Sequence, residues 1–224
     1  MPHPAALLLA LILTACQTTA PSTSPALARL DDYVAATARN AEDARDYATA
    51  AQQYAALRDG QPGNVEATLG LSRNLRALGR TDTALTAIDE TLKETGPRAD
   101  LLLERGRVLL ASGQAERALP PLKEAAGMAP QDWRVAETLG IAYDRLERWD
   151  EAAAAYRRAL ELSPGNPVVL NDLGLSRAMA GDLEEGLRLL RQAAAQPTDR
   201  PGVRETVREN IRFLEELRRT GKGG

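Results

Sequence analysis

Small and large side chains recur along this chain with a period of 34 positions. Two series of small residues and one series of large residues share this period, and a fixed period of this length is typical of repeat architectures. Small residues at matched places let helix backbones approach closely, and the large residues fill the next layer. The pattern therefore predicts an all-α chain built of stacked helical hairpins. The first small series is Ala50, Ala84, Ala118, Ala152 and Gly186, the second is Ala38, Ser72, Gly106, Gly140 and Gly174, and the large series is Tyr54, Ile88, Leu122, Tyr156 and Leu190.

Turn-forming residues mark the same boundaries. A helix-stopping proline beside turn formers occurs at 61–64, 96–97, 129–132, 163–166 and 196–199. Within hairpins, segments 78–80, 112–114 and 180–182 place a glycine where a left-handed residue follows a helix. Beyond Arg200, apolar residues recur at helical spacing up to Leu217, which predicts an amphipathic cap helix. The predicted repeat domain, 26–219, has units near 31–64, 65–98, 99–132, 133–166 and 167–200, a cap helix at 201–219 and a frayed tail at 220–224.

Two prolines conflict with this pattern. Pro120 and Pro121 fall inside the second helix of the unit 99–132, where each removes a backbone donor and crowds the preceding turn. We expect a kink or a late helix start there. A tolerated bend is favoured over a functional hinge.

The period and the residues of one unit resemble the tetratricopeptide repeat. The unit 133–166 has Leu139, Gly140, Tyr143, Ala152, Tyr156, Ala159 and Pro164 at the signature spacing of that family. The resemblance implies a right-handed superhelical solenoid of about five hairpins whose concave face binds other proteins. In this groove, arginines of the earlier units are expected to bind peptide carboxylates, and the later Leu175 and Met179 to take apolar side chains. The groove positions carried over are Arg73, Arg76, Arg107, Glu137, Asp144, Arg145, Asn171, Leu175 and Met179.

The beginning of the chain differs from everything after it. Ala5 to Ala15 is apolar and uncharged, too short to cross a bilayer and of the right length for a signal peptide. It ends in Leu-Thr-Ala-Cys, which resembles the lipobox of bacterial lipoproteins and implies diacylglycerol and palmitate on Cys16. We therefore expect a signal peptide at 1–15 and a flexible tether at 16–25; an ordinary secretory signal that leaves Cys16 free is the alternative. By the same resemblance, Gln17 indicates the outer membrane of a Gram-negative bacterium, facing the periplasm.

The inventory of reactive residues argues against catalysis. The only His, His3, lies in the predicted signal peptide, and the only Cys is the expected lipidation site. Without a triad, a redox thiol, a metal-ligand cluster or a phosphate loop, we expect no enzyme, no metal, no cofactor apart from the covalent lipid, and no small-molecule substrate. A net charge of -3 argues against a nucleic-acid partner, since no cationic excess is present.

A narrower resemblance concerns the last two units. The stretch 170–186 followed by 190–197 is similar to the TadD family of tight adherence (Flp) pilus assembly lipoproteins. This resemblance implies a pilotin-like scaffold that binds an outer-membrane secretin or other pilus assembly components. Two alternatives stay open at this point: a lipoprotein adaptor for peptidoglycan hydrolases or synthases, and an envelope enzyme with an unrecognised site.

Overall fold

The computed structural model describes residues 25–221, with side chains from residue 30 onward, and this part of the chain consists of eleven α-helices without a strand. The predicted signal peptide, Cys16 and most of the tether lie outside the described residues. The prediction of about five hairpins followed by a cap helix is confirmed. The helices are α1 (Pro25–Asp43), α2 (Tyr47–Gly60), α3 (Val65–Ala77), α4 (Thr81–Thr95), α5 (Ala99–Ala111), α6 (Ala115–Met128), α7 (Trp133–Asp144), α8 (Trp149–Leu162), α9 (Pro167–Met179), α10 (Leu183–Ala194) and α11 (Val203–Thr220).

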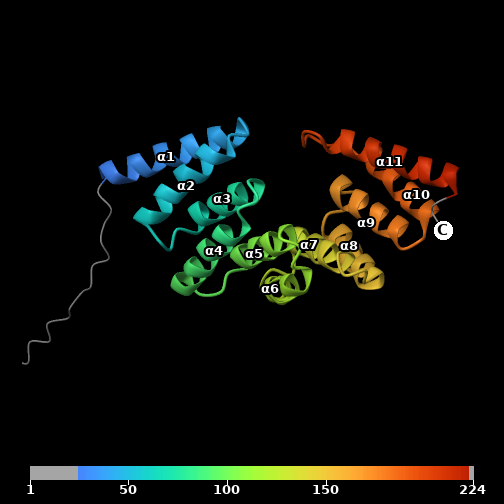
Figure 1. Ribbon diagram of the computed structural model, residues 1–224, viewed down its shortest axis with the longest axis horizontal. Coiled ribbons are helices and arrows are strands. Elements are labelled where there is room, and N and C mark those ends of the chain that lie inside the picture. Colours follow the sequence, from blue (N-terminus) through green and yellow to red (C-terminus); the bar gives the residue numbers. More distant parts are fainter. Residues whose placement is uncertain (1–24, 222–224) are drawn as a thin grey trace, which may run out of the picture.

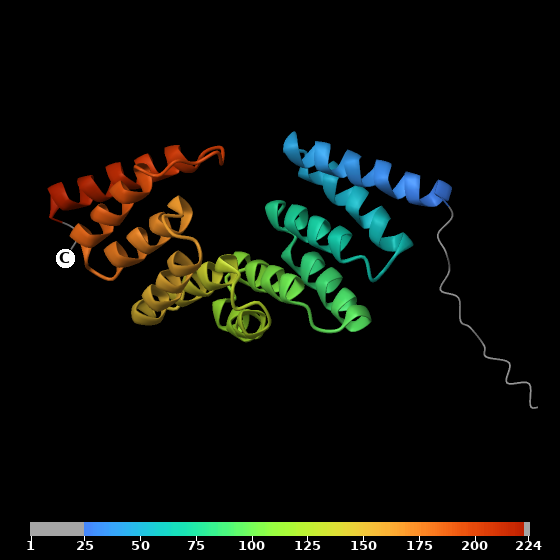
Figure 2. The same ribbon diagram turned by 180° about the vertical axis from the view of Figure 1, so that it is seen from behind.

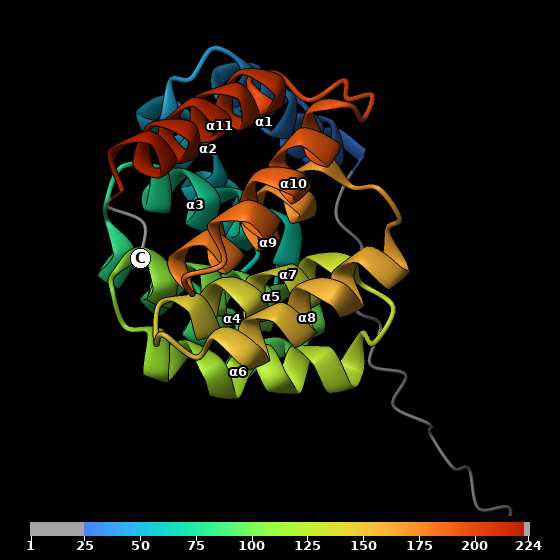
Figure 3. The same cartoon turned by 90° about the vertical axis from the view of Figure 1, so that its right-hand side faces the viewer.

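Each helix packs against its neighbours in the sequence, and the stack bends into an arch (Figure 1). Helices α1 and α11 lie at the two ends of the arch, and the reverse view shows the same open shape (Figure 2). The odd-numbered helices also contact one another, from α3 through α5, α7 and α9 to α11. They form the inner, concave layer, while α6 lies farthest on the convex side (Figure 3).

Matched small and large residues hold each hairpin together, as the periodicity predicts. Ala84, Ala118 and Ala152 are completely buried. A Cβ atom added to Gly140 would lie 2.6 Å from Cε1 of Tyr156, so the ring rests directly on the α7 backbone. The large residues thus fill space inside their own hairpin as well as toward the next one.

The turn inside each hairpin has one residue in the left-handed region, always at the same place in the 34-residue period. Glycine occupies three of these positions, as the sequence predicts. Residues with side chains, Arg45 and Glu147, occupy the other two positions. The left-handed conformation costs these residues conformational energy because Cβ crowds the backbone. The five residues and their φ angles are Arg45 (59°), Gly79 (72°), Gly113 (73°), Glu147 (56°) and Gly181 (94°).

The expectation of a late helix start at the two prolines is wrong. Helix α6 runs from Ala115 to Met128 and contains both Pro120 and Pro121. The carbonyls that lose their donors belong to Glu116 and Arg117, one turn earlier. Both residues are exposed on the convex side, so water can satisfy these groups.

Candidate functional site

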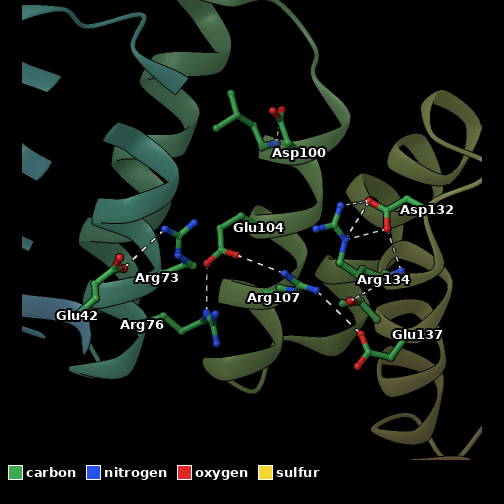
Figure 4. A network of polar contacts seen from close by, with 11 residues as sticks. Glu42, Arg73, Arg76, Asp100, Glu104, Arg107, Asp132, Arg134 and Glu137 are labelled. Atoms are coloured by element: carbon green, nitrogen blue, oxygen red, sulfur yellow. Dashed lines mark hydrogen bonds and ion pairs between the residues drawn. The ribbon is translucent and has the colours of Figure 1, made fainter. Parts of the chain in front are cut away.

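The concave layer carries ion pairs that join successive hairpins (Figure 4). At its N-terminal end, Arg73 of α3 lies 3.6 Å from Glu42 of α1. Further along, Arg76 of α3 donates from Nε to Oε1 of Glu104 on α5 at 3.2 Å. Because the partners are about thirty residues apart in sequence, these contacts link units that share no local turn.

Arg107 lies at the middle of this row, between two carboxylates. Its guanidinium is 4.0 Å from Glu104 on the same helix and 4.0 Å from Glu137 on α7. Within residues 25–221, the guanidinium of Arg107 donates no hydrogen bond to another side chain or to the backbone, and both of its carboxylate neighbours lie at ion-pair distance only. Burial lowers the pKa of Arg107 and raises the pKa of Glu137.

In each of these pairs the carboxylate is the deeper partner. The Glu104 side chain is 4% exposed, whereas Arg76 is 33% exposed. Glu42 is 24% exposed, whereas its partner Arg73 is 47% exposed. A molecule entering the N-terminal half of the groove would therefore meet guanidinium groups first.

A pocket of about 530 Å³ opens between α3, α5 and α7. Its wall includes Arg73, Glu104 and Arg107, so the two central groove arginines share one hollow. Its rim includes Asp132 and Arg134. Asp132 caps α7 by accepting from the backbone N–H of Arg134, whose guanidinium also holds the pKa of this carboxyl below its usual range.

The C-terminal half of the groove uses carboxylates differently. Asp144 of α7 accepts from the hydroxyl of Tyr156 at 2.7 Å and from Ser176 of α9 at 2.6 Å. It thereby joins three helices, and burial raises its pKa. Glu42 makes the equivalent bond to the hydroxyl of Tyr54 at 3.0 Å, three repeats earlier.

The other groove residues proposed from the sequence lie on or beside α9. Asn171 is buried and accepts from Asn210 of α11 at 2.7 Å, so it holds the cap helix in place. Leu175 is half-buried, whereas Met179 is 66% exposed. Arg145 is exposed at the end of α7.

Several polar residues of this face were missed by the sequence reasoning. Glu42 and Glu104 anchor the arginines, and the signal that would have identified them is opposite charge on neighbouring first helices. Asp172 was also missed. Burial, followed by the negative charge of Glu137, raises its pKa to about 7. Only the folded chain brings these acidic residues together.

Two classes of site are not seen in the part of the chain that the structure describes. No group of three or more His, Cys, Asp or Glu side chains is arranged to hold a metal ion among residues 25–221. Among the same residues, no helix combines the length and apolar character that crossing a membrane would require.

Four overlapping segments, 35–100, 69–133, 103–167 and 137–201, match the sequence profile described as "Tetratricopeptide repeat". Together they span more than half of the chain. The match is independent of the packing described above and agrees with it.

Curated relatives match only in part. The chain is 38% identical over 84 residues to "DnaJ protein P58IPK homolog A" of Oryza sativa subsp. japonica, covering 38% of this chain and 18% of the rice protein. It is 30% identical over 113 residues to "Uncharacterized protein y4yS" of Sinorhizobium fredii (strain NBRC 101917 / NGR234), covering 50% of this chain and 62% of that protein. The chain thus spans less than two thirds of the length of either relative.

Solved structures resemble most of the chain. A thermophilic tetratricopeptide protein of Thermus thermophilus has a TM-score of 0.71 at 20% identity, covering 81% of this chain and 98% of its own. A fragment of MamA from Desulfovibrio magneticus RS-1 has a TM-score of 0.57 at 22% identity, covering 85% of this chain and 96% of its own. At these identities the likeness shows the fold alone.

Proposed function

The chain belongs to the tetratricopeptide repeat family, and from this premise we propose that it is an outer-membrane lipoprotein that helps a pilus secretin to assemble. Its general role, a scaffold for protein–protein interaction, follows from the family. Proteins of this family are in general scaffolds rather than catalysts. The absence of an active site in this chain stays a prediction.

The observation that carries the proposal is the continuous concave layer from α3 to α11. It presents a pocket lined by Arg73 and Arg107 at its centre and the exposed Met179 toward its C-terminal end. A surface that combines charge with apolar contacts suits a folded or extended protein segment. It offers little to a small substrate, which would need an enclosed cavity with converging polar groups.

The proposed membrane location and the proposed partner protein rest on features of the sequence. The lipobox ending at Cys16 supports lipid attachment, and several acyl chains would make the anchoring permanent. Gln17 supports the outer membrane, and the stretch 170–197 supports a role in tight adherence pilus assembly. The arch would then hold the secretin on the periplasmic side of that membrane.

The test is made in the native host with the full chain. Deletion of the gene should reduce the amount of assembled secretin multimer in the outer membrane, as measured by immunoblot of unheated envelopes. Cys16→Ser should move the protein into the soluble fraction and reproduce the deletion. Co-purification of peptidoglycan hydrolases or synthases, with secretin multimers unchanged, would replace the pilus role by the cell-wall adaptor role.

A further inference from the structure

We propose that the concave face binds an extended protein segment in which three acidic residues are followed by two apolar residues, one at about every third position. This inference deepens the proposed function, because it names the chemistry of the segment that the groove holds. It rests on one column of side chains that runs across five inner helices.

The column is defined by the 34-residue period. Its members are Arg39, Arg73, Arg107, Ile141 and Leu175, on α1, α3, α5, α7 and α9 respectively. Equivalent positions on packed repeats face the same side of the solenoid. The column therefore presents three guanidinium groups in succession and then two aliphatic side chains.

The arginines of the column are held loosely by the chain's own carboxylates. Arg39 lies 3.3 Å from Glu66, with both side chains more than half exposed. The pairs of Arg73 with Glu42 and of Arg107 with its two neighbours are longer, at 3.6 Å and 4.0 Å. Exposed or long ion pairs contribute little stability. Each guanidinium can therefore turn toward a carboxylate of a partner and form bidentate hydrogen bonds.

Around Arg73 and Arg107 the carboxylates lie deeper than the arginines, and this order selects an acidic partner over a basic one. At Arg39 the order is reversed, since Glu66 is 77% exposed and Arg39 is 54% exposed. Beneath the arginines, Glu104 and Glu137 are 4% and 12% exposed, whereas Arg107 between them is 30% exposed. A basic side chain would have to displace Arg107 to reach either carboxylate. An acidic side chain meets the guanidinium edge without any rearrangement of the buried layer.

The spacing follows from helix packing. Packed helices lie about 8–10 Å apart. Because α3, α5, α7 and α9 contact one another in turn, we infer a spacing of about 10 Å between successive column members from Arg73 to Leu175. Three residues of an extended chain span about 10 Å. A segment that follows the column thus places every third side chain on it.

The C-terminal half of the groove gives the segment a direction. Ile141 and Leu175 are half-buried and offer apolar contacts, and Met179 extends this surface by one helical turn. Asp144 lies on α7, the helix that carries Ile141, and accepts two hydrogen bonds there. Its negative charge would repel the acidic end of the segment if it were bound in the opposite direction.

Fluorescence anisotropy with the full chain in detergent tests this arrangement. The probe is a labelled synthetic peptide with three glutamates followed by two leucines, each separated by two small polar residues. We expect it to bind with an affinity that falls as salt is raised. A peptide with lysines in place of the glutamates should bind at least tenfold more weakly, and so should a peptide with the same composition in scrambled order.

Two substitutions address the two ends of the column. Arg73→Gln, at an exposed position that should tolerate it, should weaken binding about tenfold because a charge-assisted hydrogen bond is lost. The matched control is Arg157→Gln, at an exposed position of α8 on the outer layer, which should leave binding unchanged. Leu175→Ser should weaken binding of the leucine-containing peptide but not of a peptide in which serines replace the leucines.

Equal binding of the glutamate and lysine peptides, or equal effects of Arg73→Gln and Arg157→Gln, would overturn the inference. The pilus role is tested separately. If secretin assembly depends on the chain while Arg73→Gln supports it fully, the groove inference fails and the function stands. If the peptide binds as described but deletion leaves the secretin intact, the function fails and the groove inference stands.

Discussion

The contact between Gly140 and Tyr156 predicts a sharp penalty for a single methyl group. In Gly140→Ala, the new Cβ would lie 2.6 Å from Cε1 and 2.7 Å from Cζ of the ring. Tyr156 is 1% exposed, and its hydroxyl donates to Asp144 at 2.7 Å, so the ring cannot move aside freely. Overpacking of this kind costs about 1–3 kcal/mol, and the better helix propensity of alanine offsets about 1 kcal/mol.

We therefore expect Gly140→Ala to lower the free energy of unfolding by up to about 2 kcal/mol, measured by urea denaturation followed by circular dichroism. The matched control is Gly127→Ala in α6, where an added Cβ would meet nothing within 4 Å. That substitution should raise stability by about 0.5–1 kcal/mol.

A double substitution tests the cause directly. The second repeat carries Ser72 and Ile88 at the places of Gly140 and Tyr156. Gly140→Ser combined with Tyr156→Ile copies that pair, so the two changes should be less destabilising together than the sum of each alone, by about 1 kcal/mol. Additive effects, or equal stability of Gly140→Ala and Gly127→Ala, would refute this account of the packing.

Three further predictions concern stability. The pKa of Asp172 is raised to about 7 by burial, so folding favours its neutral form and stability falls as pH rises from about 4 to about 7. Asp172→Asn should abolish the part of that fall that lies above pH 5, about 3 kcal/mol at most, in unfolding curves at pH 5 and pH 8; identical curves for both proteins would contradict it. Glu147→Gly should raise the melting temperature because φ is 56° there, and Gly113→Ala should lower it by a similar amount, about 1 kcal/mol in each case; an effect of the same sign in both variants would exclude backbone strain as the cause. Arg76→Ala should cost about 1–3 kcal/mol by leaving the buried Glu104 with only a distant partner, and Glu104→Ala should cost little more in that background; full additivity in the double-mutant cycle would show that the pair is not coupled.

Much of the fold follows from the sequence because its signals are local. The 34-residue period places the hairpins, and Gly79, Gly113 and Gly181 mark three of the five left-handed turns. Arg45 and Glu147 occupy the remaining two. Arginine and glutamate are not turn-forming residues, so only the register of the neighbouring repeats indicates that these two positions are left-handed turns.

The two prolines of α6 show where local rules mislead. Pro120 and Pro121 each remove a hydrogen bond, and from this cost we expected a kink or a late helix start. The helix nevertheless begins at Ala115, because Ala118 and Leu122 are fully buried against its neighbours. Packing between layers outweighs the lost hydrogen bonds, and it cannot be read from the helix alone.

The groove divides in the same way between sequence and structure. The repeat register predicts which arginines line the groove, because equivalent positions in successive repeats face the same side of the solenoid. The repeat register does not predict the partners of these arginines. The ion pairs of Glu42 with Arg73 and of Glu104 with Arg76 form only when two hairpins stack. The sequence alone determined the period, the turns and the side chains that each helix offers to the concave face. The tertiary structure decided which charges are deep and which are exposed, because burial depends on the approach of helices that no local interaction holds together.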